Sequence, residues 1–270
     1  IIIDNGSQAT ATFNLFEKYL TELGGKFNVV RHDIPFNFSK LVNYGVDVAK
    51  GEIILLLNND TQVIGPPDWL QEMIGFAQHP EIAGVGCKLL YPQDNTIQHA
   101  GLISGIAGIA NHGHKHSPAN STGYFNRLAL VANYSAITGA CLMVKRTLWE
   151  EVNGFDENLA IAFNDVDFCL KSLQLGFRHV VLPQVMFYHH ESKTRGLETT
   201  ATQKKRLAQE EAYMKTRWKK VLQHDPFYNP HLTRHSEDFT LNPESIYSCG
   251  READSWLRKA WKMIGMVKFL

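Results

Sequence analysis

A carboxylate follows directly on an uninterrupted apolar run in the first quarter of the chain. Residues 53–57 carry no polar side chain, and the run ends in Asn58, Asn59 and Asp60. Such a run predicts a central strand buried on both faces. Because open α/β sheets bind ligands beyond the carboxyl ends of their strands, Asp60 would offer an oxygen ligand to a cation shared with a diphosphate. A polar turn that merely ends the strand is the alternative.

A second pair of carboxylates, Asp165 and Asp167, stands where a helix is expected to begin after Asn164. The free N–H groups and the dipole of a helix start favour ionised carboxylates. Asp165 could accept a proton from an attacking hydroxyl group. Helix capping is the alternative for both residues, and it is sufficient for Asp167.

Two adjacent histidines, His189 and His190, end the strand-like stretch 180–188. One imidazole of such a pair can reach a metal while the other faces elsewhere, although adjacent histidines alone are a weak metal signal. Lys193 and Arg195 follow, and their charges suit a diphosphate leaving group.

These groups need elements that bring distant strand ends together. The first half alternates short apolar runs with helical patterns, which predicts βα units on a mostly parallel sheet. A helix capped by Ser39 precedes the strand at 53–57, and a charged, exposed helix is expected over 197–222. Residues 91–135 are rich in Gly, His and Asn and are interpreted as a binding loop with His112, His114 and His116 mostly in solvent.

Composition narrows the class of protein. The 270 residues are 44% hydrophobic, enough for one large domain or two small ones. Lys+Arg and Asp+Glu both number 27, so no basic field recruits nucleic acid. Cys87, Cys141 and Cys169 lie in apolar runs and are interpreted as reduced core thiols, which suits a cytoplasmic protein.

The order of the three chemical segments is more specific than any one of them. Residues 1–196 resemble inverting GT-A glycosyltransferases of family 2, most closely the bacterial members, including rhamnosyltransferase-like ones, that build O-antigen, capsule and other surface polysaccharides. The matching segments are 4–7, 36–45, 49–52, 58–61, 69–70, 154–157, 164–167 and 189–196.

The resemblance implies an α/β fold of GT-A (Rossmann-like) type, a mostly parallel sheet flanked by helices, with a C-terminal helical extension. Residues 1–196 would form the catalytic domain without its first βα unit. Residues 197–250 would form a helical and irregular extension that packs on it, and residues 251–270 a basic amphipathic helix.

The resemblance also implies roles for single residues. Asp165 matches the catalytic base, and Asp60 with His189 or His190 would hold Mg²⁺ or Mn²⁺, with His189 the preferred ligand. The residues assigned to the donor are Asp4 at the nucleobase, Asn43, Asn59, Asp60 and Arg195. The residues assigned to the acceptor are Thr138, Gly139, Asp167 and His99.

Two positions depart from the family pattern. Asn58 replaces the first Asp of the DxD motif, which should weaken intrinsic metal affinity, and Asn164 replaces the Glu that usually precedes the base. A noncatalytic nucleotide-sugar-binding homologue is therefore one alternative. A nucleotidyltransferase on a related scaffold is another, but it needs a Gly-rich basic phosphate loop near the first strand, and the Asp165 and His189 segments argue against it.

The expected enzyme moves a hexosyl or deoxyhexosyl group from a nucleotide-diphosphate sugar to a glycan or lipid-linked acceptor, with inversion and with no nucleic-acid partner. A lipid-linked acceptor would place it at the inner face of the cell membrane. Residues 254–270 offer a means of peripheral contact, because Trp256, Ile264 and Val267 share one helical face and Lys259 and Lys262 lie opposite. Packing of this helix on the core is the alternative.

Overall fold

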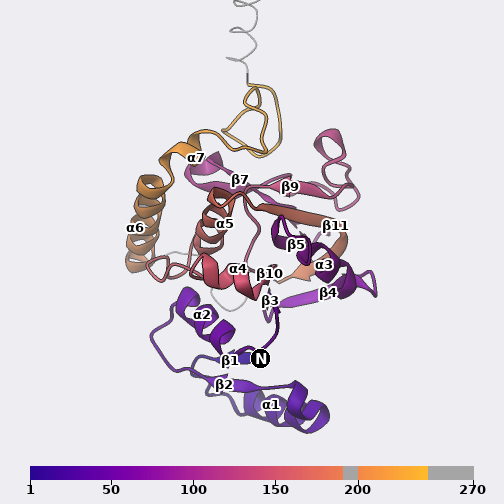
Figure 1. Cartoon of the computed structure of the whole chain (residues 1–270), viewed down its shortest axis with the longest axis vertical. Coiled ribbons are helices and arrows are strands. Elements are labelled where there is room, and N and C mark those ends of the chain that lie inside the picture. The colour runs from indigo at the N-terminus through magenta and orange to yellow at the C-terminus, as the bar shows by residue number, and fades with distance from the viewer. Residues whose placement is uncertain (191–199, 243–270) are drawn as a thin grey trace, which may run out of the picture.

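The computed structural model describes residues 1–190 and 200–242. Its main sheet has seven strands, with the order β3–β10–β5–β11–β4, β6 beside β5 and β9 beside β11. The strands are β3 (Ile53–Leu57), β4 (Thr61–Gly65), β5 (Ile82–Leu90), β6 (Ile97–His99), β9 (Ala132–Tyr134), β10 (Cys141–Lys145) and β11 (Arg178–His189). Helices flank this sheet, as Figure 1 shows.

The expected predominance of parallel strands is wrong for this sheet. Among its described pairings only β5 and β11 run parallel, and β10 is antiparallel to both β3 and β5. The strand β3 is also not central, because it stands at the end of the strand order, and Leu57 is 44% exposed. An apolar run indicates that both faces of a strand are hydrophobic. It does not indicate which strands lie beside it or in which direction they run.

A separate parallel pair lies at the N-terminal end of the molecule (Figure 1). It consists of β1 (Ile2–Asp4) and β2 (Val29–Arg31), connected by α1 (Thr10–Leu23). The chain then forms α2 (Phe38–Val48), which contacts β1 and leads into β3. Asn37 caps α2 by accepting a hydrogen bond from the backbone N–H of Lys40, so Ser39 is not the cap.

The alternation of side chains along β10 divides the core into two clusters. Cys141 and Met143 pack on the side of α3 (Trp69–Ala77), whereas Leu142 and Val144 pack on the side of α5 (Asn164–Gln174). The short helix α4 (Arg146–Glu151) follows β10 directly. Cys87, Cys141 and Cys169 are buried free thiols, as expected.

The predicted helix at 197–222 is two helices, α6 (Ala201–Arg217) and α7 (Lys219–Gln223). Their apolar side packs on the core, as expected for this extension, because Met214, Trp218 and Leu222 join the core cluster on the α5 side. Within residues 1–190 and 200–242, no helix is long and apolar enough to cross a membrane. The segment 254–270 lies outside the described residues.

Parts of the His-rich region belong to the core, although His116 is exposed, as expected. It contains β6, β7 (Leu102–Ser104), β8 (Ala110–His112) and β9. Ile97, Ile103 and Ile106 are fully buried there. His114 is buried against Phe239, with ring centroids 4.1 Å apart, so its interpretation as a surface residue is wrong.

Candidate active site

The turn after β3 meets the end of β11. These segments are adjacent because β4 pairs antiparallel with β11, with Thr61 opposite His189. Nε2 of His189 lies 3.1 Å from Oδ1 of Asp60, which confirms that the two side chains converge. His190 contacts the same turn through its backbone N–H, which donates to the carbonyl oxygen of Asp60 at 2.9 Å.

This pair suits a divalent cation. Oδ1 of Asp60 is buried and accepts no hydrogen bond from the described residues. Two neighbouring ligands of an octahedral cation at about 2.1 Å lie about 3 Å apart, close to the observed separation of Nε2 and Oδ1. The described residues contain no group of three or more His, Cys, Asp or Glu that could hold a metal, so Asp60 and His189 would form only part of a coordination shell.

Asp165 is held at the start of α5 by backbone donors. Its Oδ2 accepts from the N–H of Gly139 at 2.9 Å, and its Oδ1 accepts from the N–H of Val166 at 2.8 Å. Burial raises the pKa of Asp165 above its ordinary value, and these hydrogen bonds oppose that shift. A partly buried, fixed carboxylate with a raised pKa is suited to accept a proton.

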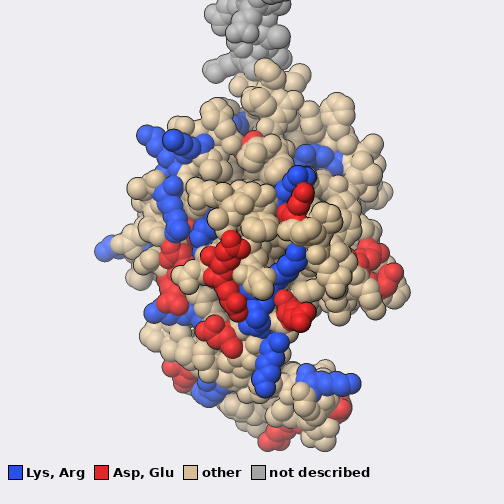
Figure 2. Space-filling model, in the orientation of Figure 1, with Lys and Arg blue, Asp and Glu red and all other residues tan. Residues whose placement is uncertain are grey.

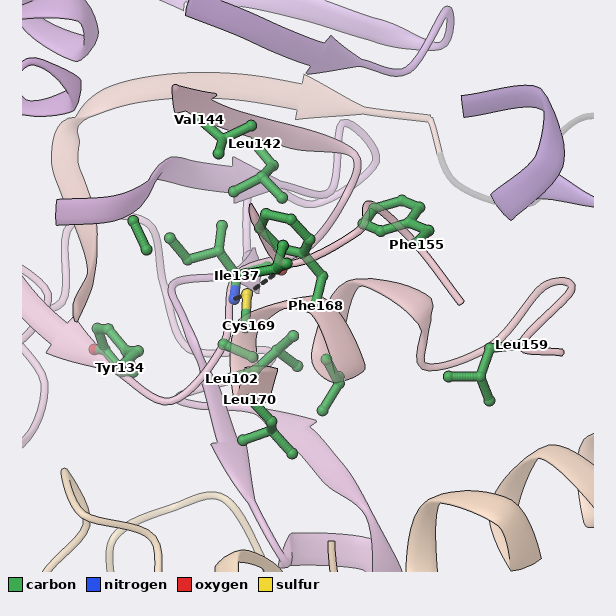
Figure 3. Packing of buried hydrophobic residues seen from close by; sticks show 14 of the residues in the cluster. Leu102, Tyr134, Ile137, Leu142, Val144, Phe155, Leu159, Phe168, Cys169 and Leu170 are labelled. Carbon is green, nitrogen blue, oxygen red and sulfur yellow. Dashed lines mark hydrogen bonds between the residues drawn. The ribbon is translucent and has the colours of Figure 1, made fainter. Parts of the chain in front are cut away.

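The loop 138–140 joins the two candidate centres. Ala140 accepts a hydrogen bond from the backbone N–H of Asn58 at 2.9 Å, while Gly139 donates to Asp165. Ile137 precedes this loop, and its backbone nitrogen lies 3.5 Å from Sγ of Cys169 on α5 (Figure 3). The turn after β3 and Asp165 therefore both hydrogen-bond to adjacent residues of this short segment.

The segment around α2 positions the loop that precedes α5. The side-chain amide of Asn43 donates to the carbonyl oxygen of Phe155 and accepts from the N–H of the same residue, both at 2.9 Å. Ser39 donates to the carbonyl oxygen of Leu159. Asn43 therefore has a structural role at residue 155, beside the donor role expected from the sequence.

The side chains of Asp167 and His99, both expected at the acceptor, are fully buried and therefore not accessible to one. Asp167 accepts a hydrogen bond of 2.8 Å from Nε1 of Trp218 and lies 3.7 Å from Nζ of Lys171. Nδ1 of His99 lies 2.8 Å from Nδ1 of His112. Residues two apart on a helix face different directions, which is why Asp167 turns away from Asp165.

The remaining predicted site residues are dispersed. Asp4 accepts hydrogen bonds from the N–H of Ser7 and from Arg31, and these contacts lower its pKa. Asn59 is exposed and Thr138 is half-buried. Arg195 lies outside the described residues. Figure 2 shows a hollow between the surface over α1 and the surface over β4, with cationic and anionic side chains interspersed on this face.

Two supporting residues escaped the sequence analysis. Oε1 of Gln98 lies 2.7 Å from Nδ1 of His189. Glu210 on α6 accepts from the N–H groups of Ile161 and Ala162, just before α5. A single Gln in an apolar stretch or a single Glu in a charged helix carries no sequence signal of such contacts.

Comparison with known proteins identifies the family of this chain. The model of Glycosyl transferase family 2 matches residues 1–150. The chain is 44% identical to an uncharacterized protein, y4gI, of Sinorhizobium fredii, over 90% of this chain and 26% of that protein. It is 33% identical to the O-antigen biosynthesis protein RfbC of Myxococcus xanthus, over 94% of this chain and 20% of that protein.

A third relative is the amylovoran biosynthesis glycosyltransferase AmsB of Erwinia amylovora, 27% identical over 70% of this chain and 59% of that protein. The chain thus spans only about a quarter and a fifth of the first two relatives.

Two solved structures share the fold. One is the mannosyltransferase PcManGT of Pyrobaculum calidifontis in complex with GDP-Man and Mn²⁺, with a TM-score of 0.54, 18% identity, and coverage of 82% of this chain and 57% of that one. The other is GalNAc-T7 with UDP, GalNAc and Mn²⁺, with a TM-score of 0.62, 14% identity, and coverage of 87% and 45%. These identities support a GT-A fold and no more. Since the family model matches more than half of its residues, the chain belongs to glycosyl transferase family 2.

Proposed function

We propose that this chain transfers a sugar from a nucleotide-diphosphate sugar to a glycan or lipid-linked acceptor, with inversion, in the synthesis of a surface polysaccharide. The observation that carries the proposal is the joint placement of two centres. The loop 138–140 hydrogen-bonds both to Asp165 and to Asn58, which begins the turn that carries Asp60 beside His189.

The chemistry follows from this placement. Asp165 takes the proton of an acceptor hydroxyl group as its oxygen forms a bond to the anomeric carbon. The bond from that carbon to the diphosphate oxygen breaks on the opposite face, so the configuration inverts. A divalent cation, Mg²⁺ or Mn²⁺, held by Asp60 and His189 would stabilise the negative charge of the leaving diphosphate.

The proposal also covers the residues that would bind the donor and the acceptor. Asp4, Asn59 and Arg195 would contact the donor, and Thr138 and Gly139 would lie under the acceptor. The names of the O-antigen and amylovoran relatives support a polysaccharide product. A lipid-linked acceptor would place the reaction at the cytoplasmic face of the membrane, and the transferred group would be a hexosyl or deoxyhexosyl unit.

The test is release of nucleoside diphosphate from a panel of nucleotide sugars, with Mn²⁺ or Mg²⁺ and with EDTA. We expect release from one donor class only, abolished by EDTA and strongly reduced in Asp60→Asn and His189→Ala. Gln184→Met, an exposed change on β11, serves as the control. Absence of release with every donor would contradict transferase activity, and release that is indifferent to EDTA would contradict the metal.

One observation favours a second candidate, a nucleotide-sugar-binding homologue without activity. Nδ2 of Asn58 lies 3.3 Å from Nε2 of His189, where the family pattern has a carboxylate. An amide N–H at that place can occupy the imidazole lone pair that a cation would need. Calorimetric binding of a donor without any turnover would support this candidate, and Asn58→Asp should then strengthen Mn²⁺ binding.

A further inference from the structure

Gln98 contacts the His189 ring on the side away from Asp60. It belongs to β6, is only 3% exposed, and reaches the end of β11 with both atoms of its amide. Its Oε1 lies 2.7 Å from Nδ1 of His189, and its Nε2 lies 3.4 Å from the backbone carbonyl oxygen of the same residue. A buried amide is costly unless it is hydrogen-bonded, so these contacts need a reason.

The two contacts determine which nitrogen of His189 carries the proton. A carbonyl oxygen only accepts hydrogen bonds, so the NH₂ group of Gln98 must be the part that faces the backbone of residue 189. Oε1 of Gln98 then faces Nδ1, and because Oε1 also only accepts, Nδ1 carries the hydrogen. In the neutral ring, Nε2 therefore carries the lone pair, and the side-chain amide of Asn58 lies 3.3 Å from it.

An acceptor lies close to that lone pair, besides the amide of Asn58. Nε2 lies 3.1 Å from Oδ1 of Asp60, which accepts no hydrogen bond from the described residues. Two acceptors at this distance are an unfavourable pair in a neutral state, and a cation between them removes the conflict. With the opposite tautomer, the hydrogen on Nε2 would take the place that a cation needs.

We propose that Gln98 is a positioning residue that holds His189 in the Nδ1–H tautomer and so keeps Nε2 open to a divalent cation beside Asp60. The inference rests on the proposed function, since it supposes that the Asp60–His189 pair binds a cation. It adds to that function a residue of β6 that touches neither the substrate nor the cation.

The test compares the wild-type chain with Gln98→Met, which keeps the size of the side chain and removes the acceptor, and with Gln98→Glu, which keeps an acceptor for Nδ1. Mn²⁺ affinity is measured by calorimetry. The His189 tautomer is read from its ring ¹⁵N chemical shifts in the metal-free protein, at about pH 8, where an ordinary imidazole is neutral. Gln184→Met on β11 is the matched control.

We expect Gln98→Met to weaken Mn²⁺ binding by about 10–100-fold, as is usual when the partner of a metal-bound histidine is lost, and to shift His189 towards Nε2–H. Gln98→Glu should restore the Nδ1–H tautomer and most of the affinity. Wild-type affinity and an unchanged tautomer in Gln98→Met would overturn the inference, as would equal losses in both variants, which would indicate a general packing role.

Failure of the proposed function gives a different result. If the wild-type chain binds no Mn²⁺, the cation site itself is overturned. The ¹⁵N shifts then still decide whether Gln98 sets the state of the ring.

Discussion

The backbone N–H of Gly139 donates a hydrogen bond of 2.9 Å to Oδ2 of Asp165. The next residue, Ala140, accepts from the backbone N–H of Asn58, which begins the turn that carries Asp60. Adjacent peptide groups thus bind a carboxylate suited to take a proton and the turn that leads to the cation-binding pair. The predictions below separate residues that act in this site from residues that support it.

Replacement of Asp165 by Asn should lower turnover by about 10²–10⁴-fold, the usual range for loss of a general base. Donor affinity should change little, because the substitution removes a proton acceptor and not a donor contact. Steady-state turnover and donor binding by calorimetry check both parts. Near-normal turnover in this variant would remove Asp165 from the mechanism.

Replacement of Asp167 by Ala should act on stability instead. Its carboxylate is fully buried and pairs with Trp218, Lys171 and Arg217, so its loss removes the negative charge that faces two cationic groups. Breaking a buried pair of this kind costs about 3–5 kcal/mol of unfolding free energy. Urea unfolding measures the change, with Asp165→Asn as the comparison. An unchanged midpoint would show that the pair contributes nothing.

The Asn43 amide should matter for the loop before α5. Asn43→Ala leaves both backbone polar groups of Phe155 without their partner, which costs about 1–3 kcal/mol. Hydrogen exchange at the Phe155 amide should become faster, while the amides of α3 keep their protection. If Phe155 exchanges at the wild-type rate, the contact does not hold the loop.

Acid should destabilise the protein because several buried or half-buried histidines are neutral in the fold. Burial lowers the pKa of His112 to about 3, of His114 to about 4 and of His179 to about 3, from an ordinary value of 6.5. At these three residues the unfolded chain binds protons below pH 6.5, whereas the folded chain binds them only near their lowered pKa values. The stabilisation is therefore complete above pH 6.5 and is lost as the pH falls towards 4 and then 3.

Urea unfolding at a series of pH values below 6.5 checks this dependence. His179→Gln should reduce the slope of unfolding free energy against pH, because one buried neutral imidazole is removed. The exposed His79→Gln is the control and should leave the slope unchanged. A wild-type stability that is flat between pH 6.5 and 4 would contradict the assignment.

The segment 254–270 should promote binding to anionic membranes, through its apolar face and its opposite cations. Co-sedimentation with vesicles of anionic and of neutral lipid, using the chain with and without these residues, measures the effect. We expect binding that depends on both the segment and the lipid charge. Equal binding by the two chains would show that the segment does not mediate contact.

Much of the site was accessible from local patterns. The Asn164 segment does begin a helix with Asp165 and Asp167 in its first turn, and the stretch at 180–188 is a strand that ends at His189. The convergence of Asp60 and His189 was also predicted, but from the order of motifs in a family and not from any local property. The spacing of apolar residues in a local sequence indicates whether the segment is a helix or a strand and which of its faces is polar.

Only the tertiary structure showed which groups these elements bring together. The antiparallel position of β10 places β3 at the end of the sheet order, and no periodicity in residues 53–57 encodes that neighbour. The amide of Asn43 on Phe155 and that of Gln98 on His189 join segments that are distant in the chain. Hydrogen-bond partners of buried polar groups depend on packing between such segments. For that reason the sequence alone determined the candidate chemistry, and the fold determined which side chains support it.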